Sequence, residues 1–417
     1  MAAPATAATP SQPAPPGVPG GLRRNRSFQI ILSGQFVSGL GDQIARIAVP
    51  WVVYDLTGSA SQMGAISAIT NLPQLIFGLP AGAYVDRLNR RRLLIGSDVA
   101  CALIIAMIPL LMVLGAIRVW QLAALIFLLQ VVVVFYFVAL QASLPNIVAR
   151  QDLAAANSWL HLSDSTVGLV GPTLAGALIA SIGIAPALGI DVLTFGASML
   201  SVLVVAIPQV WPKDRGARRS LWADVFEGLR FLWKETSLRL LVLVLMGVNV
   251  GVSAYMGLLV FHLRHNLAWS PTQVGAVFSA AGFASLIVAP LVPALSKRFR
   301  RGAVVTAGLV VAGLAGPVVG FGRSLWLVAG AWAALAIASG IVNVLLVTLR
   351  QQIVPNELLG RVMSSSRFLA RLAVPPTMWL AGLGGDAFGA PVVLAAAGAF
   401  ILLVAAAGAA FGLGRVK

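Results

Sequence analysis

The chain has 417 residues, of which 59% are hydrophobic and only 10% charged, and its formal net charge is +16. So apolar a composition excludes an ordinary soluble domain and is typical of a polytopic membrane protein. The basic residues stand in short clusters between apolar runs rather than in one groove or tail. They therefore indicate membrane topology and argue against a nucleic-acid partner. The single cysteine, Cys101, excludes an internal disulfide.

Residues 1–26 are rich in Ala, Pro and Gly, which predicts a disordered cytoplasmic tail. Twelve apolar segments of membrane-spanning length follow, centred near residues 40, 72, 104, 130, 170, 196, 250, 282, 312, 336, 374 and 402. The even-numbered connections hold most of the arginine and lysine, at Arg87 to Arg92, Arg150, Lys213 to Arg239, Lys297 to Arg301 and Arg350 to Arg361. The positive-inside rule then predicts that both termini face the cytoplasm.

The chain repeats itself at an offset near 210 residues. IVARQDLAAANS from Ile147 is similar to IVPNELLGRVMS from Ile353, and DRLNRR after the second segment is similar to SKRFRR after the eighth. Such a parallel repeat predicts an all-α integral membrane protein with two six-helix halves, residues 27–208 and 239–417. The linker, residues 209–238, would separate them.

The linker contains an amphipathic pattern. Its apolar residues recur at helical spacing, at Trp222, Val225, Phe226, Leu229, Leu232 and Trp233. The pattern predicts a helix that lies either on the inner leaflet or on the ends of the bundle.

The stretch GAYVDRLNRRR after the second segment resembles the loop motif of the major facilitator superfamily. The matching residues are Gly82, Asp86, Arg87, Arg90 and Arg91, whereas Tyr84 and Asn89 depart from the motif. The stretches GQFVSGLGDQIARIAVPW, LPNIVARQDLAAANS and FEGLRFLW are similar to the enterobactin-exporter-like, drug-efflux branch. The resemblance covers the chain after the tail and implies a twelve-helix transporter. It also implies that the loop aspartate pairs with helix 11, at Arg361 or Arg367, and closes the inner side.

GLVGPTLAG in the fifth segment resembles a motif associated with exporters. Gly171, Pro172 and Gly176 match it, and Ala175 replaces a glycine. Small residues allow close helix packing against the other half, and proline bends the helix. The resemblance implies export.

Energy coupling requires a group that changes charge within the membrane. Asp42 lies near the middle of the first segment and is the deepest acid. Arg46 follows one turn later, where an i, i+4 ion pair can form. The pair is either a permanent structural contact or a proton switch that opens when substrate or helix movement separates it.

Asp164 and His161, three residues apart on the fifth segment, are a second candidate for proton exchange. The alternative is a network at the inner gate with Arg367 or Arg371. Asp98 is predicted to join the arginines near Arg91, without a role in transport, and Asp191 to cap the outer end of the sixth segment.

Amides and phenols inside the spans are the candidates for substrate contacts, because they are unfavourable in lipid. They are Gln43, Asn71, Gln130, Tyr136, Asn249, Tyr255 and Asn343. A cavity with few fixed charges and apolar walls suits bulky amphipathic or weakly polar compounds.

The sequence contains no Walker, HExxH or GxSxG motif, and its three histidines lack metal-ligand spacing. It predicts no enzyme, cofactor or metal site. We expect a monomeric, multi-pass protein of the bacterial cytoplasmic membrane that exports drugs, antibiotics or siderophore-like molecules in exchange for protons. Uptake of a small metabolite, or a receptor or scaffold without transport, remain the alternatives.

Overall fold

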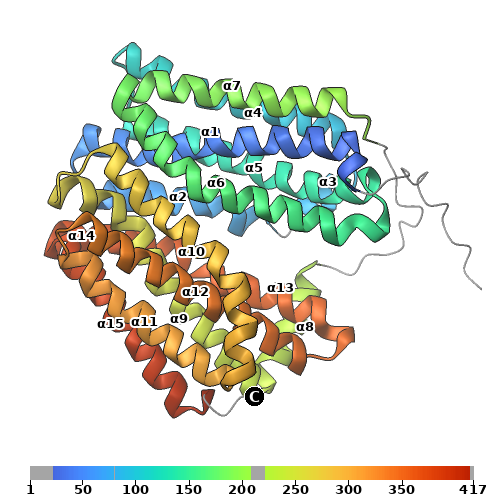
Figure 1. The fold of residues 1–417 in the computed structure, drawn as a ribbon, viewed down its shortest axis with the longest axis vertical. Coiled ribbons are helices and arrows are strands. Elements are labelled where there is room, and N and C mark those ends of the chain that lie inside the picture. Colours follow the sequence, from blue (N-terminus) through green and yellow to red (C-terminus); the bar gives the residue numbers. More distant parts are fainter. Residues whose placement is uncertain (1–21, 79, 208–220, 414–417) are drawn as a thin grey trace, which may run out of the picture.

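The computed structural model describes residues 22–78, 80–207 and 221–413 (Figure 1). Within these ranges the chain is helical and contains no strand. The predictions for residues 1–21 and for 209–220 of the linker lie outside the described residues.

The N-terminal helices form one group in Figure 1. They are α1 Arg26–Thr57, α2 Ala60–Phe77, α3 Ala81–Val85, α4 Arg90–Val113, α5 Val119–Ile147, α6 Leu153–Ile182 and α7 Ile184–Val204. Side chains that accept backbone hydrogen bonds mark several starts, because the first N–H groups of a helix have no partner within it. Asn25 accepts from Phe28 N, and Ser59 accepts from Gln62 N.

The C-terminal helices form the second group. They are α9 Thr236–Phe261, α10 Pro271–Arg298, α11 Arg301–Phe321, α12 Leu325–Ile353, α13 Asn356–Leu372, α14 Val374–Phe388 and α15 Ala390–Ala410, with the π-helical turn η3 His262–Asn266 after α9. The predicted eleventh segment is thus divided between α13 and α14. The prolines at 375 and 376 explain the break, since proline has no N–H to donate and disfavours helix in the residue before it.

Nine of the described helical segments are long and apolar enough to cross a membrane. The helices α1, α2 and α14 are not among these nine. The protein is therefore an all-helical, multi-pass membrane protein, and the full number of twelve spans stays a prediction.

Two close helix pairs join the groups. At α6 and α10, a Cβ at Gly176 would collide with the backbone oxygen of Pro271, and one at Gly275 with that of Pro172. At α2 and α14, a Cβ at Gly64 would lie 2.5 Å from the backbone oxygen of Met378. Glycine allows such backbones to approach closely.

The described part of the linker forms α8, Leu221–Lys234, as the amphipathic pattern predicts. It packs on α13, where Leu232 is buried and Glu227 accepts a hydrogen bond of 2.7 Å from Arg361. Phe226 and Trp233 remain exposed. The helix therefore packs on the end of the bundle, and its contact with the inner leaflet stays a prediction.

Candidate functional site: a cavity between the two groups of helices

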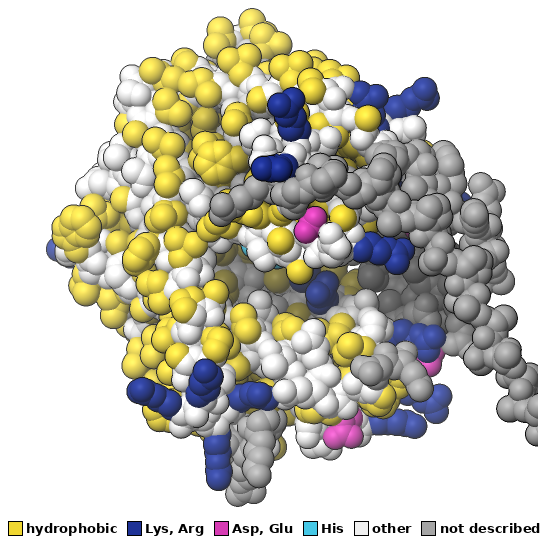
Figure 2. All heavy atoms as spheres, turned by 45° about the vertical axis from the view of Figure 1, so that its right-hand side comes forward, with side chains coloured by type: hydrophobic (Ala, Val, Ile, Leu, Met, Phe, Trp, Pro, Cys, Tyr) yellow, Lys and Arg dark blue, Asp and Glu magenta, His cyan; other side chains and the backbone are white. Residues whose placement is uncertain are grey.

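A cavity of about 1020 Å³ lies between the two groups. Helices α1, α2 and α5 line one side, and α9, α10, α12, α13 and α14 line the other. Figure 2 shows the molecule hollowed between the groups on the side where Figure 1 has α3, α8 and α13, with basic side chains around the opening. The cavity therefore opens towards the end that carries the loop arginines.

Contacts between the groups close the opposite end. Arg264 of η3 forms an ion pair of 2.5 Å with Asp55 of α1, and its guanidinium carbon lies 4.2 Å from the ring centroid of Trp51. The hydroxyl of Tyr54 lies 3.0 Å from Nδ1 of His265. Sequence analysis did not single out Arg264 or His265, because contacts between residues about two hundred positions apart leave no local pattern.

Asp386 of α14 adds a second closing contact. Its carboxylate accepts hydrogen bonds from Ser59 Oγ at 2.8 Å, Ala60 N at 2.7 Å and Ser61 N at 3.0 Å. These donors stand at the start of α2, where the helix dipole also favours a negative charge. Sequence analysis did not single out this aspartate.

Four of the seven predicted polar contacts line the cavity, at Asn71, Gln130, Asn249 and Asn343. Gln43 instead lies beneath Gly171, where a Cβ would be 2.5 Å from its Cγ. Tyr136 is hydrogen-bonded within the N-terminal group, and Tyr255 is buried edge-on against Trp332. These three side chains were predicted to face the substrate and are placed elsewhere, inside the packed helices.

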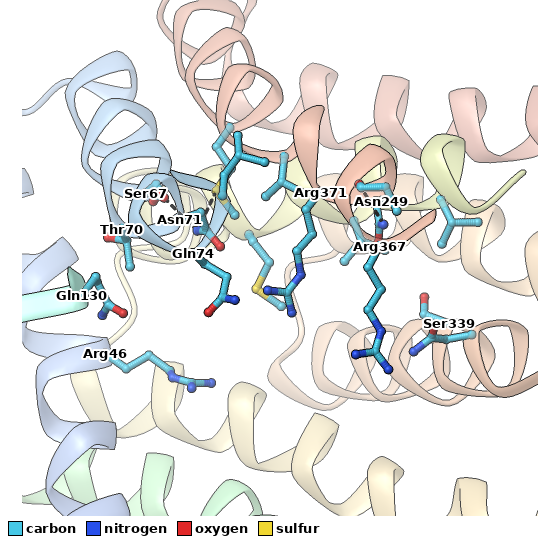
Figure 3. Close-up of a pocket in the computed structure, with 18 of the residues that line it drawn as sticks. Arg46, Ser67, Thr70, Asn71, Gln74, Gln130, Asn249, Ser339, Arg367 and Arg371 are labelled. Carbon is cyan, nitrogen blue, oxygen red and sulfur yellow. Dashed lines mark hydrogen bonds between the residues drawn. The ribbon is translucent and has the colours of Figure 1, made fainter. Parts of the chain in front are cut away.

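Further polar residues of α2 join Asn71 on the cavity wall. Ser67, Thr70 and Gln74 surround it in Figure 3, and all of them line the cavity. Their spacing of three and four residues places them on one helical face. That periodicity was the available signal that would have found them from the sequence.

Four arginines also line the cavity: Arg46, Arg350, Arg367 and Arg371. Figure 3 shows Arg46, Arg367 and Arg371 extending into the same open space from α1 and α13. The predicted cavity with few fixed charges is therefore wrong, although its many apolar walls are present. Sequence analysis assigned these C-terminal arginines to topology or to a gate, because they stand close to basic connections.

The predicted coupling pair is on α1 beside this cavity. Arg46 lines the cavity, and Asp42 is exposed one helical turn away. Among the described residues no ion pair joins the two side chains, although the Asp42 carboxylate and the Arg46 guanidinium interact electrostatically. The arrangement fits a pair that is separated in this conformation.

Asp98 and Asp191 are buried inside the N-terminal group. Ser198 of α7 donates a hydrogen bond of 3.1 Å to Asp98 of α4, and it also contacts Tyr136 at 3.1 Å and Gln35 at 3.2 Å. Asp191 is fully buried eight residues into α7, with Thr194 Oγ1 at 3.3 Å. The predictions of an arginine partner for Asp98 and of an interfacial cap at Asp191 were wrong, because the packing of α1, α4 and α7 turns both inward.

Ser198 connects three polar side chains in this buried network, so its loss leaves groups without partners. We expect Ser198→Ala to lower the free energy of unfolding by about 1–3 kcal/mol, the range for an unsatisfied buried polar group. Denaturant unfolding of the purified protein in detergent measures it. Ser158→Ala is the matched control, because the exposed Ser158 donates to Ala154 O in its own helix. Equal losses in both variants would contradict the role of the network.

The loop motif is fixed within the N-terminal group. Arg90 lies 3.5 Å from Asp86 and donates to Ala142 O of α5 at 2.8 Å. Arg91 donates to Leu203 O at the end of α7 at 2.5 Å. Arg91 thereby satisfies a carbonyl group in the last turn of α7, and Arg90 joins the loop to α5. Arg87 is exposed, and a Cβ at Gly82 would meet open space rather than a neighbouring helix.

The two candidate partners of Asp86 on α13 have other surroundings here. Arg361 pairs with Glu227 of α8, and Arg367 lines the cavity. Asp164 and His161 are exposed on α6 and interact electrostatically with each other. Gly171 contacts α1, whereas Pro172 and Gly176 contact α10.

A multi-pass helical bundle with a cavity open at one end is the arrangement expected of a membrane transporter. A family model described as transmembrane secretion effector matches residues 21–417. The chain therefore belongs to this family of the major facilitator superfamily, and it is a transporter rather than an enzyme.

Characterised relatives match most of the chain. It is 29% identical to the multidrug efflux pump Tap of Mycolicibacterium fortuitum, over 86% of this chain and 89% of that protein. It is 25% identical to macrolide efflux protein A of Streptococcus pyogenes, over 91% and 94%.

Solved structures share the fold at low sequence identity. A bacterial homologue of the iron transporter ferroportin in the inward-facing state superposes with a TM-score of 0.73 at 18% identity, over 94% of this chain and 99% of that chain. The nucleoside transporter NupG gives 0.76 at 11% identity, over 93% and 99%.

Proposed function

We propose that this protein is a proton-coupled exporter of drug-like small molecules in the bacterial cytoplasmic membrane. The observation that carries the proposal is the cavity of about 1020 Å³, open at the arginine-rich end and closed at the other by contacts between the two groups of helices. The efflux functions of the relatives named above support export. Its family membership supports a cycle in which two six-helix halves rock around this cavity.

In this proposal the twelve spans are α1, α2 with α3, α4 to α7, α9 to α12, α13 with α14, and α15. The arginine-rich end is the cytoplasmic end, so both termini face the cytoplasm, and the structure represents the inward-open state. When the inner side closes, Asp86 pairs with an arginine of α13, while Asp164 and His161 contribute to the same gate. The protein acts as a monomer.

Proton coupling is assigned to Asp42 and Arg46. In the inward-open state the carboxylate and the guanidinium are not joined, so the carboxyl group is free to take up a proton. In the other state Arg46 returns to it and favours release of the proton, because a nearby positive charge stabilises the carboxylate.

Substrate-induced collapse of a pH gradient in inside-out vesicles tests this function. We expect wild type to respond to members of a panel of lipophilic cations, macrolides and catecholate siderophores, and Asp42→Asn to lose at least about nine tenths of the response, as a coupling step without its proton acceptor requires. Asp152→Asn is the control, because it makes the same chemical change at a carboxylate that lies outside the cavity and makes no capping hydrogen bond at the start of α6. If purified wild type binds a member of the panel but never collapses the gradient, then proton-coupled export is wrong, and uptake or a receptor role takes its place.

A further inference from the structure

The charge of the cavity points to a substrate class. We propose that the cavity selects anionic amphipathic molecules, with a carboxylate, phosphate or similar group on an apolar body. The inference rests on the proposed export through this cavity. It reverses the expectation of weakly polar substrates, which assumed few fixed charges.

The lining residues carry charge of one sign. Arg46, Arg350, Arg367 and Arg371 all line the cavity, and no aspartate, glutamate, lysine or histidine is among the described residues that do so. They come from α1, α12 and α13, so the positive charge reaches the cavity from both groups of helices. A cation that enters meets repulsion in a space with low-dielectric walls, where the charges are poorly screened.

Arg350 is the most buried of the four. It is 1% exposed, its Nε donates to Leu346 O at 2.9 Å, and its Nη1 is buried without a hydrogen-bond partner in the described structure. Arg367 is near enough to repel it. A buried guanidinium without a counter-charge is unfavourable, so an anion that enters the cavity gains a charge-assisted contact there.

The acids that the structure describes neutralise little of this charge. The described ion pairs hold Asp86, Asp55 and Glu227 against arginines outside the cavity. Among the described acids, Asp42 of α1 acts electrostatically on a cavity arginine, Arg46. The arginines on α12 and α13 are therefore left for the substrate.

Arg367 and Arg371 supply the geometry for recognition. They stand one turn apart on α13 and point into the same space (Figure 3). Guanidinium groups bind carboxylates and phosphates through paired hydrogen bonds, so two neighbouring forks can hold one anionic group. Opposite them, Val49, Ile66 and Leu129 offer apolar walls for the rest of the molecule.

Binding of two matched probes to the full-length protein in neutral detergent tests the proposal. Pyrenebutyrate and pyrenebutylamine share the same apolar body and differ in charge. We expect pyrenebutyrate to bind at least about tenfold more tightly, and the double variant Arg367→Gln/Arg371→Gln to lose that preference. Arg323→Gln should keep it, because Arg323 is exposed in the connection between α11 and α12.

The outcomes separate this inference from the proposed function, because binding is measured without a pH gradient. Equal or tighter binding of pyrenebutylamine, or a preference that persists in the double variant, would overturn the anionic selectivity even if the vesicles show proton-coupled export. A preference for pyrenebutyrate would support it even if the gradient does not collapse. Inorganic phosphate should displace the probe weakly. If inorganic phosphate displaced the probe at concentrations as low as those at which pyrenebutyrate itself binds, the requirement for an apolar body would be overturned.

Discussion

Gly176→Ala is expected to lower transport at least about tenfold and to hold the closed end of the cavity open. A Cβ at this position would collide with the backbone oxygen of Pro271 and lie 3.0 Å from Thr272 Cα, and a backbone has little freedom to yield. Overpacking of this kind destabilises by about 1–3 kcal/mol. Since about 1.4 kcal/mol is tenfold in an equilibrium, the conformation with this contact becomes rare and the transport cycle slows.

The distance between spin labels at Leu56→Cys and Asn266→Cys reports the opening directly. Both side chains are exposed at the closed end, and the native Cys101 is buried and should remain unlabelled. Gly168→Ala is the matched control, because it lies on the same helix and a Cβ there meets nothing within 4 Å. If both alanine variants transport alike, or if the labels in Gly176→Ala keep the wild-type distance, the close contact does not determine the state.

Asp386→Ala should open the same end by a different route. The variant removes an acceptor of three hydrogen bonds that joins α14 to the start of α2. Hydrogen bonds to a charged group contribute about 1.5–3 kcal/mol, and exposure of this carboxylate reduces that figure. We expect a several-fold to about tenfold larger open fraction in the spin-label experiment, with lower transport.

Asp386→Asn separates charge from geometry. The amide keeps one acceptor oxygen, so its effect should lie between those of wild type and alanine. Asp152→Ala controls for the loss of a surface charge, since it also stands at a helix start but makes no capping hydrogen bond there. An open fraction in Asp386→Ala equal to that in Asp152→Ala would show that the carboxylate does not hold the helices together.

The membrane-spanning segments and the basic connections could be predicted from the sequence, because the bilayer constrains the composition of each segment separately. A span must satisfy its own backbone hydrogen bonds and present apolar side chains to lipid, so composition and length identify it. The amphipathic helix α8 was predicted from the helical spacing of its apolar residues, which is also a local feature of the sequence. The sequence also identified the motif residues Gly171, Pro172 and Gly176. It did not predict which residues of α1 and α10 they contact.

The surroundings of polar side chains were less predictable. Tyr136 and Tyr255 satisfy the rule that polar groups avoid lipid by packing against other helices, whereas Asn71 and Asn249 satisfy it by facing the cavity. Helical periodicity separates the lipid-facing side from the rest of a helix. It cannot separate a packed interface from a cavity wall, because both are equally remote from lipid.

The sequence by itself therefore determined the membrane class, the helical segments, the basic end and the family motifs, all of which depend on local composition. Only the tertiary structure decided that Arg46, Arg350, Arg367 and Arg371 share one cavity, that Asp98 and Asp191 are buried beside α1, and that Asp386 caps a helix of the other group. These contacts join residues that can be more than three hundred positions apart in the sequence. They depend on which helices become neighbours and how each is rotated, and packing of the whole bundle sets both.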